Sequence, residues 1–230
     1  MKAALWARRL HKWLALVIGL QALAWMAGGL YMTAIAIGTV HGNHLAVRSL
    51  HAPLSGAPVV SPEAFAEQFD AVRSLKLKHW SGRDVYEVRH AAGIDLVDAH
   101  AGTVLTPLGA EAAIAVARAH YLGQAEVAGV EHLDTPPQEM AGREPPLWRV
   151  SFADASRTTL YVSAATGEMV GRRHTLWRWF DFFWMLHIMD YAEREDINNP
   201  LLRVASFVGL LFSVGGAWLL WFAFARRART

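Results

Sequence analysis

Two long stretches without a charged residue, one near each end of the chain, constrain its fold more than any other feature. No Lys, Arg, Asp or Glu occurs in residues 13–47 or in residues 204–225. A helix of roughly 20 apolar residues crosses the hydrocarbon core of a bilayer, which is about 30 Å thick. The sequence therefore predicts a two-pass membrane protein whose spans cover about residues 13–37 and 204–224, with a polar region between them.

Basic residues flank the outer end of each predicted span. Positive charge beside a span stays on the cytoplasmic side of a membrane, so we expect both termini in the cytoplasm and residues 41–200 on the opposite side. The formal net charge of +2 comes mostly from these residues and does not indicate nucleic-acid binding. They are Lys2, Arg8, Arg9 and Lys12 before the first span, and Arg226, Arg227 and Arg229 after the second.

The chain contains no cysteine. Disulfides, thiolate catalysis, iron–sulfur clusters and cysteine-based zinc sites are therefore excluded. The sequence also shows no recognisable nucleophilic triad, phosphate-binding loop or pair of acid–base carboxylates. We therefore expect no catalytic activity from this chain on its own.

The polar region contains an internal repeat of alternating strands, each copy with a glycine turn. The turns are predicted at Gly102 and Gly167, because a tight hairpin favours glycine where φ is positive. Apolar and polar residues alternate through four segments, as expected for half-buried strands. These segments are residues 86–89 and 95–105 in the first copy and residues 148–151 and 160–170 in the second.

Each copy begins with a helix-like stretch. The first is predicted to open at Ser61 as the N-cap, with Pro62 at the first helical position, and to extend to residue 69. The second covers residues 110–121, and a proline-rich loop follows at residues 134–146. The predicted fold is a membrane α+β protein, in which two transmembrane helices flank a tandem module of helix plus antiparallel strands, twice.

Several short motifs occur in a characteristic order. They are Arg8-Arg-Leu-His-Lys-Trp13 before the first span, Val40-His-Gly-Asn-His-Leu45 after it, two hairpins with the pattern Ala-x-x-Gly, Trp184-Met-Leu-His187, and the glycine-rich last span. Together these motifs resemble those of PepSY-domain proteins with PepSY-associated transmembrane helices. The resemblance implies a protein of the bacterial cytoplasmic (inner) membrane, with both termini cytoplasmic and a periplasmic tandem PepSY-like module.

Larger members of this family have more spans and resemble siderophore-iron reductases, some of which bind b-type haem through transmembrane histidines. This chain departs from them in having only two predicted spans. The predicted organisation is an N-terminus and first span (1–40), a first PepSY-like unit (41–106), a second unit (107–174), an interfacial aromatic helix with an acidic loop (175–200), and a second span with a tail (201–230).

The aromatic segment 176–191 is the strongest candidate for a functional site. At helical spacing one of its faces carries aromatic rings and a histidine, while Arg178 and Asp181 are expected to pair on another face. So apolar a helix suits the membrane interface. The residues of the aromatic face are Trp177, Phe180, Trp184, His187 and Tyr191.

His187, His41 and His44 are predicted at the same face of the membrane. Neutral imidazole ligates haem iron and divalent transition metals. We expect His187 to be one axial ligand of a b-type haem, with His44 as the other ligand and His41 as its alternative. The three histidines could instead hold a transition-metal ion, or serve only as polar groups at the interface. His11 lies about 39 Å along the helix from residue 37 and cannot share one iron with His187.

The leading interpretation is an accessory or electron-transfer subunit of an inner-membrane redox or iron-uptake system. An alternative is a non-redox periplasmic interaction or assembly module anchored by two helices, and a second alternative is a haem-bearing ferric-siderophore reductase. The expected partners are the lipid bilayer, other membrane protein subunits or a redox partner, and a second copy of the chain. Nucleic acid is not expected.

Two further segments carry predictions. Small residues on both spans, including Gly19, Gly28 and Gly29, are positions at which another helix can approach closely. The acidic loop at residues 190–199 is predicted to be a solvated turn, and the alternative is a weak Ca²⁺ or partner site.

Overall fold

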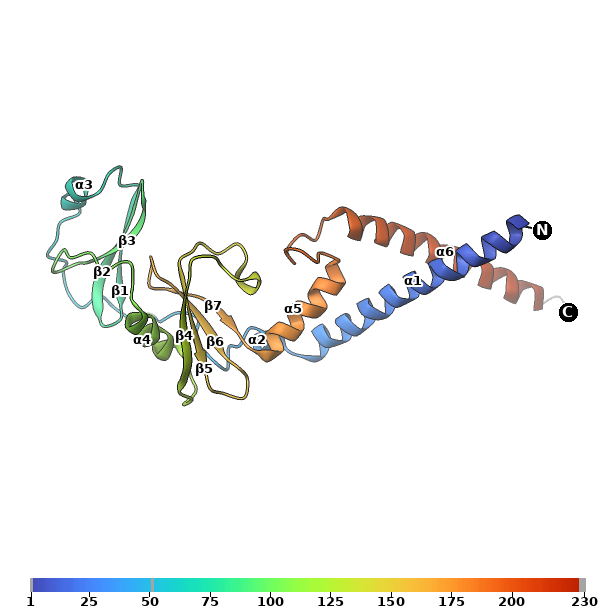
Figure 1. The fold of residues 1–230 in the computed structure, drawn as a ribbon, viewed down its shortest axis with the longest axis horizontal. Coiled ribbons are helices and arrows are strands. Elements are labelled where there is room, and N and C mark those ends of the chain that lie inside the picture. Colours follow the sequence, from blue (N-terminus) through green and yellow to red (C-terminus); the bar gives the residue numbers. More distant parts are fainter. Residues whose placement is uncertain (1, 51, 228–230) are drawn as a thin grey trace. The chain divides into compact units, whose positions relative to one another are not determined.

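The computed structural model describes residues 2–50 and 52–227, with side chains described over residues 12–13, 15–50 and 52–218. The chain divides into a helix unit (Met1–Ala36 and Trp179–Thr230) and a sheet unit (Ile37–Arg178). In chain order (Figure 1) the elements are α1 (Lys2–Ala34), α2 (Ile37–Val40), α3 (Ala64–Gln68), β1 (Ser74–Trp80), β2 (Arg83–His90), β3 (Gly93–Asp98), α4 (Ala110–His120), β4 (Val127–Leu133), the 3-10 helix η1 (Gln138–Met140), β5 (Leu147–Phe152), β6 (Thr159–Ser163), β7 (Met169–Arg173), α5 (Thr175–Ile188) and α6 (Pro200–Arg227).

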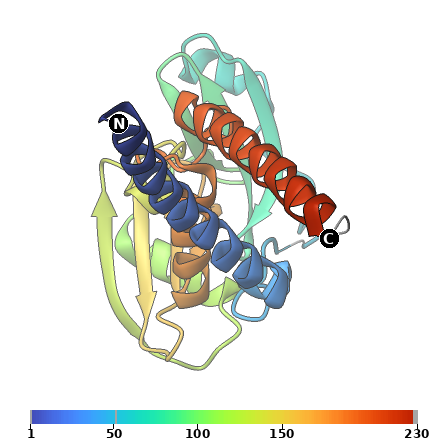
Figure 2. The same cartoon turned by 90° about the vertical axis from the view of Figure 1, so that its right-hand side faces the viewer.

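The helix unit contains two helices that are long and apolar enough to cross a membrane. The qualifying segments are Ala15–Ala34 of α1 and Pro200–Trp218 of α6. Both helices are uninterrupted in two perpendicular views (Figures 1 and 2), and the first turn of α1 and the last turn of α6 lie at the same end of this unit. The prediction of two long apolar helices flanking a polar region is confirmed, with boundaries a few residues from those expected.

Two side chains of α1 cap the C-terminal turn of α5. Gln21 Nε2 donates a hydrogen bond to the carbonyl oxygen of Leu186 (3.1 Å), and Trp25 Nε1 donates one to the carbonyl oxygen of His187 (2.9 Å). The last carbonyls of a helix have no partner within the helix. The residues that satisfy them here come from the apolar part of α1, so this turn of α5 lies beside that span.

Helix α5 also approaches α1 closely at one of the glycines of α1. A Cβ added at Gly28 would lie 3.5 Å from the backbone oxygen of Phe183, whose ring lies 5.0 Å from that of Tyr31. The approach of another helix is thus confirmed at Gly28. Beyond the helix end, Asn199 Nδ2 donates to the carbonyl oxygen of Ile188 (2.8 Å), which connects the start of α6 to the end of α5.

In the sheet unit, the first sheet has the antiparallel order β1-β2-β3 and is covered on both faces. Because side chains alternate between faces, Tyr86 and Val88 point to one side, where they pack with Phe65 of α3. Val85 and Leu96 point to the opposite side. All five are buried, so neither face of this sheet is left to solvent at its centre.

The second sheet has the antiparallel order β4-β5-β6-β7, and α4 packs on one of its faces. Val116 of α4 belongs to the same buried cluster as Val150 and Leu160. Ala112 of α4 instead packs against the cluster of the first sheet that contains Leu96. One helix therefore contributes side chains to the cores of both sheets.

The proline-rich loop covers the other face of the second sheet. Met140 is buried with Tyr161 in a separate cluster. Glu139 accepts hydrogen bonds from the Tyr161 hydroxyl (2.6 Å) and from Arg178 Nε (2.8 Å). Burial raises the pKa of Tyr161, and the Glu139 carboxylate raises it further. The insertion is thus an ordered layer of the fold.

Several local predictions differ from the structure. The first helix of the repeat begins at Ala64, and no side chain caps it. The amides of Ala64 and Phe65 bond to carbonyls three residues earlier, at Ser61 and Pro62, so the predicted first helical turn is instead a tight turn that precedes the helix. The prediction of the N-cap at Ser61 was therefore wrong.

Strands β1 and β4 were not predicted. Lys76 and Lys78 alternate with leucines in β1, but the strand is too polar to resemble a core strand. Strand β4 is mostly exposed, so its apolar signal is weak. The turn glycines were predicted correctly, since φ is +69° at Gly102 and +65° at Gly167.

Arg178 and Asp181, which helical spacing allows to pair, have other partners in the structure. Arg178 pairs with Glu139, and Asp181 pairs with Arg194 of the acidic loop. Spacing along one helix permitted the local pair, but each side chain has an oppositely charged partner outside the helix.

Candidate functional site

A cavity of about 650 Å³ lies in the sheet unit between the first sheet and the elements that pack on the second. Its wall is formed by β1, by the last turn of α4, by the turn between β6 and β7, and by the segment before α3. This volume falls within the range of pockets that hold small ligands, which is roughly 300–1,000 Å³. We call it the inter-sheet cavity.

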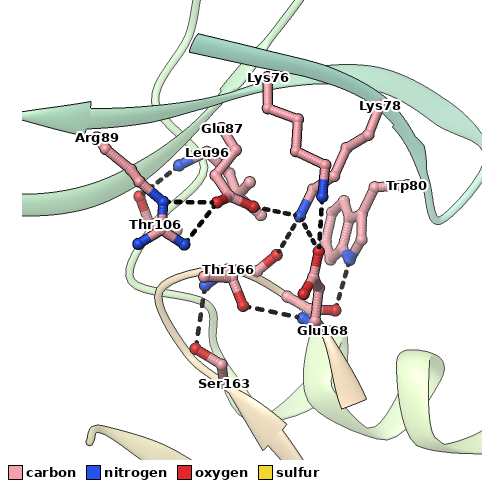
Figure 3. A network of polar contacts seen from close by, with 11 residues as sticks. Lys76, Lys78, Trp80, Glu87, Arg89, Leu96, Thr106, Ser163, Thr166 and Glu168 are labelled. Atoms are coloured by element: carbon pink, nitrogen blue, oxygen red, sulfur yellow. Dashed lines mark hydrogen bonds and ion pairs between the residues drawn. The ribbon is translucent and has the colours of Figure 1, made fainter. Parts of the chain in front are cut away.

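Lys78 joins the two sheets beside this cavity (Figure 3). Its ammonium group donates to Glu87 Oε2 (2.8 Å) of the first sheet, and to the Thr166 carbonyl oxygen (3.0 Å) and Glu168 Oε1 (2.9 Å) of the second. An ammonium group has three hydrogens to donate. All three are used, and Lys78 is therefore a structural cation rather than a free one.

Glu87 is the nearly buried anion of this network. Arg89 also donates to its carboxylate, from Nη2 at 2.9 Å. Burial would raise the pKa of Glu87, but the hydrogen bonds and charges of Lys78 and Arg89 outweigh burial and lower that pKa. The carboxylate is therefore held in its ionised form, which keeps the junction intact at neutral pH.

Trp80 makes the second bridge between the sheets. Its Nε1 donates to the carbonyl oxygen of Gly167 at 2.8 Å. A Cβ added at Gly167 would lie only 2.4 Å from the same indole nitrogen. Glycine is therefore required here by the contact with Trp80 as well as by the positive φ.

Ser55, His79 and Asp84 at the edge of the cavity have the composition of a catalytic triad but not its geometry. Asp84 Oδ1 lies 2.9 Å from His79 Nδ1, and Ser55 Oγ lies 3.4 Å from that same nitrogen. In a triad the acid and the serine bind opposite ring nitrogens. His79 held in this way cannot accept the Ser55 proton.

The cluster instead holds the segment before α3 against the sheet. The Ser55 amide donates to Asp84 Oδ2 at 2.7 Å. Burial would raise the pKa of Asp84, but hydrogen bonds from His79 and from the amides of Ser55 and Gly56 outweigh it, so the pKa lies below its ordinary value. Asp84 is an ionised acceptor that fixes both the loop and the His79 ring.

Two imidazoles face the inter-sheet cavity with one nitrogen already engaged. His79 Nδ1 is bound to Asp84, and His120 Nδ1 lies 2.8 Å from the carbonyl oxygen of Val47. Since both partners are acceptors, Nδ1 carries the proton in each ring, and Nε2 remains as the group that can meet a ligand. Among the described residues, the charged lining side chains are three cations, Arg48, Lys76 and Lys78, and one anion, Glu168.

The predicted haem ligands are found in different units. His187 belongs to the helix unit, where its ring lies 6.5 Å from that of Trp25 and stacks at 6.4 Å on that of Trp184. Its Nδ1 is buried and has no hydrogen-bond partner in the described part of the chain. His41 and His44 belong to the sheet unit and are exposed. The side chain of His11 lies outside the described residues.

A histidine that the sequence analysis missed lies beside His44. His174 is buried, its Nε2 donates to the Val40 carbonyl oxygen (2.9 Å), and its ring meets the His44 ring edge-on at 5.8 Å. Burial lowers the pKa of His174, and the nearby His44 adds to this effect against the hydrogen bond to Val40. His174 therefore serves as a neutral support for the chain that follows α2.

The acidic loop is organised around one carboxylate. Asp190 accepts hydrogen bonds from the backbone amides of Ala192, Glu193, Glu195 and Asp196, and these amides lower its pKa. Among the side chains that the structure describes, no group of three or more His, Asp or Glu residues is placed to hold a metal ion.

No family model matches this chain, and neither a curated protein nor a solved structure was found to be similar to it.

Proposed function

We propose that this chain is a membrane-anchored accessory protein whose sheet unit binds a partner segment or a small ligand in the inter-sheet cavity. One observation carries the proposal: a cavity of about 650 Å³ whose wall is held open by side chains of one sheet bonded to the turn of the other. A pocket built by two sheets together is a typical binding site at the junction of two substructures.

The proposed ligand is an amphipathic molecule or peptide segment with a negatively charged group. Leu54, Leu77 and Met169 offer apolar surface, while Lys76 and Arg48 supply positive charge near it. Lys76 is the less neutralised lysine, because the one ion pair it forms with a described side chain is a long one, to Glu168 at 3.8 Å, and its side chain is 63% exposed. A negative group would therefore meet Lys76 rather than the saturated Lys78.

Anchoring in a bilayer is part of the proposal. It is supported by the two apolar helices and by the side-chain caps on the last carbonyls of α5, since backbone polar groups in lipid must be satisfied within the protein. The PepSY-like tandem module, the bacterial inner membrane, cytoplasmic termini and a periplasmic sheet unit are proposed on the order of the sequence motifs. The position of the two helix ends at one end of the helix unit supports that topology.

A matched pair of positions on α4 tests the binding proposal. Ala119 and Ala115 are both exposed and lie one turn apart, but only Ala119 lines the cavity. We expect ligand or partner that co-purifies with the full chain in mild detergent to be lost in Ala119→Trp and kept in Ala115→Trp, as measured by native mass spectrometry. Equal retention by the two variants, or a wild-type chain that retains nothing, would contradict the proposal.

A second candidate function is electron transfer in a redox or iron-uptake system, with a b-type haem held by His187. The observation that favours it is the buried Nδ1 of His187, which has no hydrogen-bond partner among the described residues, on a ring that lies within 6.5 Å of two tryptophan rings. An unsatisfied imidazole in apolar surroundings fits a haem ligand. His44 as the other ligand, or His41, stays a prediction. Haem would supply a one-electron carrier, and the apolar rings around His187 would exclude water.

The haem proposal has its own test. Membranes containing the wild-type chain should show reduced-haem absorption bands after addition of dithionite. His187→Ala should lose them, whereas His100→Ala, at an exposed position of the sheet unit, should keep them. A wild-type chain without bands when haem is supplied would leave the non-redox interaction module as the better account. The same result would also contradict the second alternative, a haem-bearing siderophore reductase.

A further inference from the structure

A second pocket, of about 500 Å³, opens on the sheet unit where the chain leaves α2. It is lined by residues of the segment 41–49 and by Arg172 of β7. No acidic side chain is among the described residues that line it. The groups available for recognition are two guanidinium groups, an imidazole, a hydroxyl and an amide, so the pocket is rich in donors.

Arg172 is fixed at the floor of this pocket. One of its terminal nitrogens donates to the Ala46 carbonyl oxygen, and the other donates to Asn43 Oδ1 at 2.8 Å. Both acceptors are neutral, so the positive charge is positioned without being neutralised. Burial lowers the pKa of Arg172, and the nearby positive charge of Arg48 lowers it further.

Arg48 is the movable member of the pair. It is exposed, and within the described part of the chain its guanidinium makes no hydrogen bond or ion pair. Two cations that face one pocket without a carboxylate repel each other, and an anion between them would reverse the sign of that interaction. An anion in this pocket would therefore be attracted by both guanidinium groups.

The guanidinium groups of Arg48 and Arg172 indicate which kind of anion the pocket would bind. A guanidinium presents paired N–H donors that match two oxygens of a phosphate group. His41 and Ser49 line the same pocket and offer further donors. We infer that Arg48 and Arg172 bind a phosphate group, either as the free anion or as the phosphodiester of a lipid headgroup.

Because residues 41–49 follow α1 closely in the chain, both a lipid headgroup and a free phosphate could reach the pocket. His41 follows the end of the apolar span at Ala34 by seven residues. Even a fully extended chain of seven residues reaches only about 25 Å. If α1 crosses a bilayer, the pocket thus lies within reach of lipid headgroups, while its open side also admits a dissolved anion.

Binding of radiolabelled inorganic phosphate tests the inference, with the full chain in a maltoside detergent that contains no phosphorus. Arg48→Met should raise the dissociation constant about tenfold or more, because a charge-assisted pair is lost. Arg143→Met removes an exposed arginine elsewhere in the sheet unit and should bind as the wild type does. Arg172→Lys, which leaves the inter-sheet cavity untouched, should also weaken binding because the paired donors are lost.

Mixed micelles that contain phosphatidylglycerol distinguish the two sources. If the site takes a headgroup, the lipid should displace labelled phosphate from the wild type, and native mass spectrometry should show a bound lipid that Arg48→Met loses. If the site takes free phosphate, the lipid should not compete. The inference is overturned if the wild type binds neither phosphate nor the lipid, or if Arg48→Met keeps wild-type affinity for both.

Discussion

The two sheets of the sheet unit differ in where the residues that cover them come from. The second sheet is covered by residues of its own copy of the repeat, whereas the first is covered in part by residues of the other copy. The second sheet has an eleven-residue helix on one face and the proline-rich loop on the other. The first sheet has the five-residue α3 on one face, together with loop residues such as Val60 and Val72. Its other face is covered by Leu108 and Ala112, which belong to the second copy of the repeat. The first sheet therefore depends on the second for its core, and the inter-sheet cavity lies at the edge of this shared layer.

The turns at Gly167 and Gly102 give the strongest test of this asymmetry. Both glycines have positive φ, which costs a β-branched residue about 1–3 kcal/mol. At Gly167 a new Cβ would also meet the Trp80 ring at 2.4 Å, whereas at Gly102 the nearest atom is Val60 Cγ2 at 3.4 Å. With an overpacking cost of about 1–3 kcal/mol added, we expect Gly167→Val to lose about 2–6 kcal/mol in all. Gly102→Val should lose about 1–3 kcal/mol.

Urea unfolding of the full chain in detergent measures both losses. The double variant Trp80→Ala with Gly167→Val isolates the contact, because removing the ring should remove the overpacking part of the cost. Equal losses for the two glycine variants would mean that the bridge between the sheets contributes nothing, which contradicts the account of the cavity wall given above.

Cooperativity of the two sheets is the next test. Leu96 in the first sheet and Leu160 in the second are both fully buried, and truncating a buried leucine to alanine costs about 2–5 kcal/mol. Because α4 contributes to both cores, Leu96→Ala and Leu160→Ala should shift one common transition. Hydrogen exchange of β2 and β6 amides is the measurement. Two separate transitions, each moved by only one variant, would show that the sheets fold independently.

Sequence patterns predicted the turns but not their partners. Gly102 and Gly167 were identified because positive φ is a local property. The bond from Trp80 to Gly167 joins residues 87 positions apart, and no local pattern indicates it. The shared use of α4 was missed for the same reason: Ala112 and Val116 lie one turn apart on one apolar face, and the sequence does not show that this face contacts two sheets.

The candidate sites show the same limit. The three histidines predicted as ligands were chosen for their residue type and place near a span, and a ligand role for His187 stays a prediction. The inter-sheet cavity was not predicted, because its wall combines lysines of β1 with a distant turn. A signal was present in the alternation of Lys76 and Lys78 with leucines, which marks a strand with one charged face.

We expect the loss of stability in acid to arise at the junction of the two sheets, where Glu87 binds Lys78. The pKa of Glu87 lies below its ordinary value of 4.5 in the folded protein. The stability that this carboxylate contributes is therefore present above pH 4.5 and is lost as the pH falls through the lower, folded-state pKa. Glu87→Gln should cost about 1.5–3 kcal/mol at pH 7, the value of hydrogen bonds to a charged group. As the pH falls, the free energy of unfolding of this variant should also decrease less steeply than that of the wild type.

Glu131 provides the control for that experiment. It pairs with Arg149 on the second sheet, but its side chain is 52% exposed, and exposed ion pairs contribute little. Chemical denaturation between pH 3 and pH 7 should therefore separate Glu87→Gln from Glu131→Gln. A common profile for the two variants would place the acid sensitivity outside the junction.

The smallest expected loss of stability comes from removing one hydroxyl group near each sheet, that of Thr158 or that of Ser55. Thr158 follows β5 and is buried, with its hydroxyl donating to Asp154 Oδ2 at 2.6 Å. Ser55 is exposed, and its hydroxyl lies 3.5 Å from Asp84 Oδ1. Thr158→Val leaves a half-buried carboxylate with one donor fewer and should cost about 1–2 kcal/mol. Ser55→Ala should stay within about 0.5 kcal/mol, as for most surface substitutions.

Thr158→Ser completes this comparison, because it keeps the hydroxyl group and removes only a methyl group. It should recover most of the stability lost in Thr158→Val, as judged by the thermal unfolding midpoint. A large loss in Ser55→Ala would instead mean that the hydroxyl holds the segment before α3. In the structure that task falls to the Ser55 amide, whose bond to Asp84 Oδ2 at 2.7 Å survives the substitution.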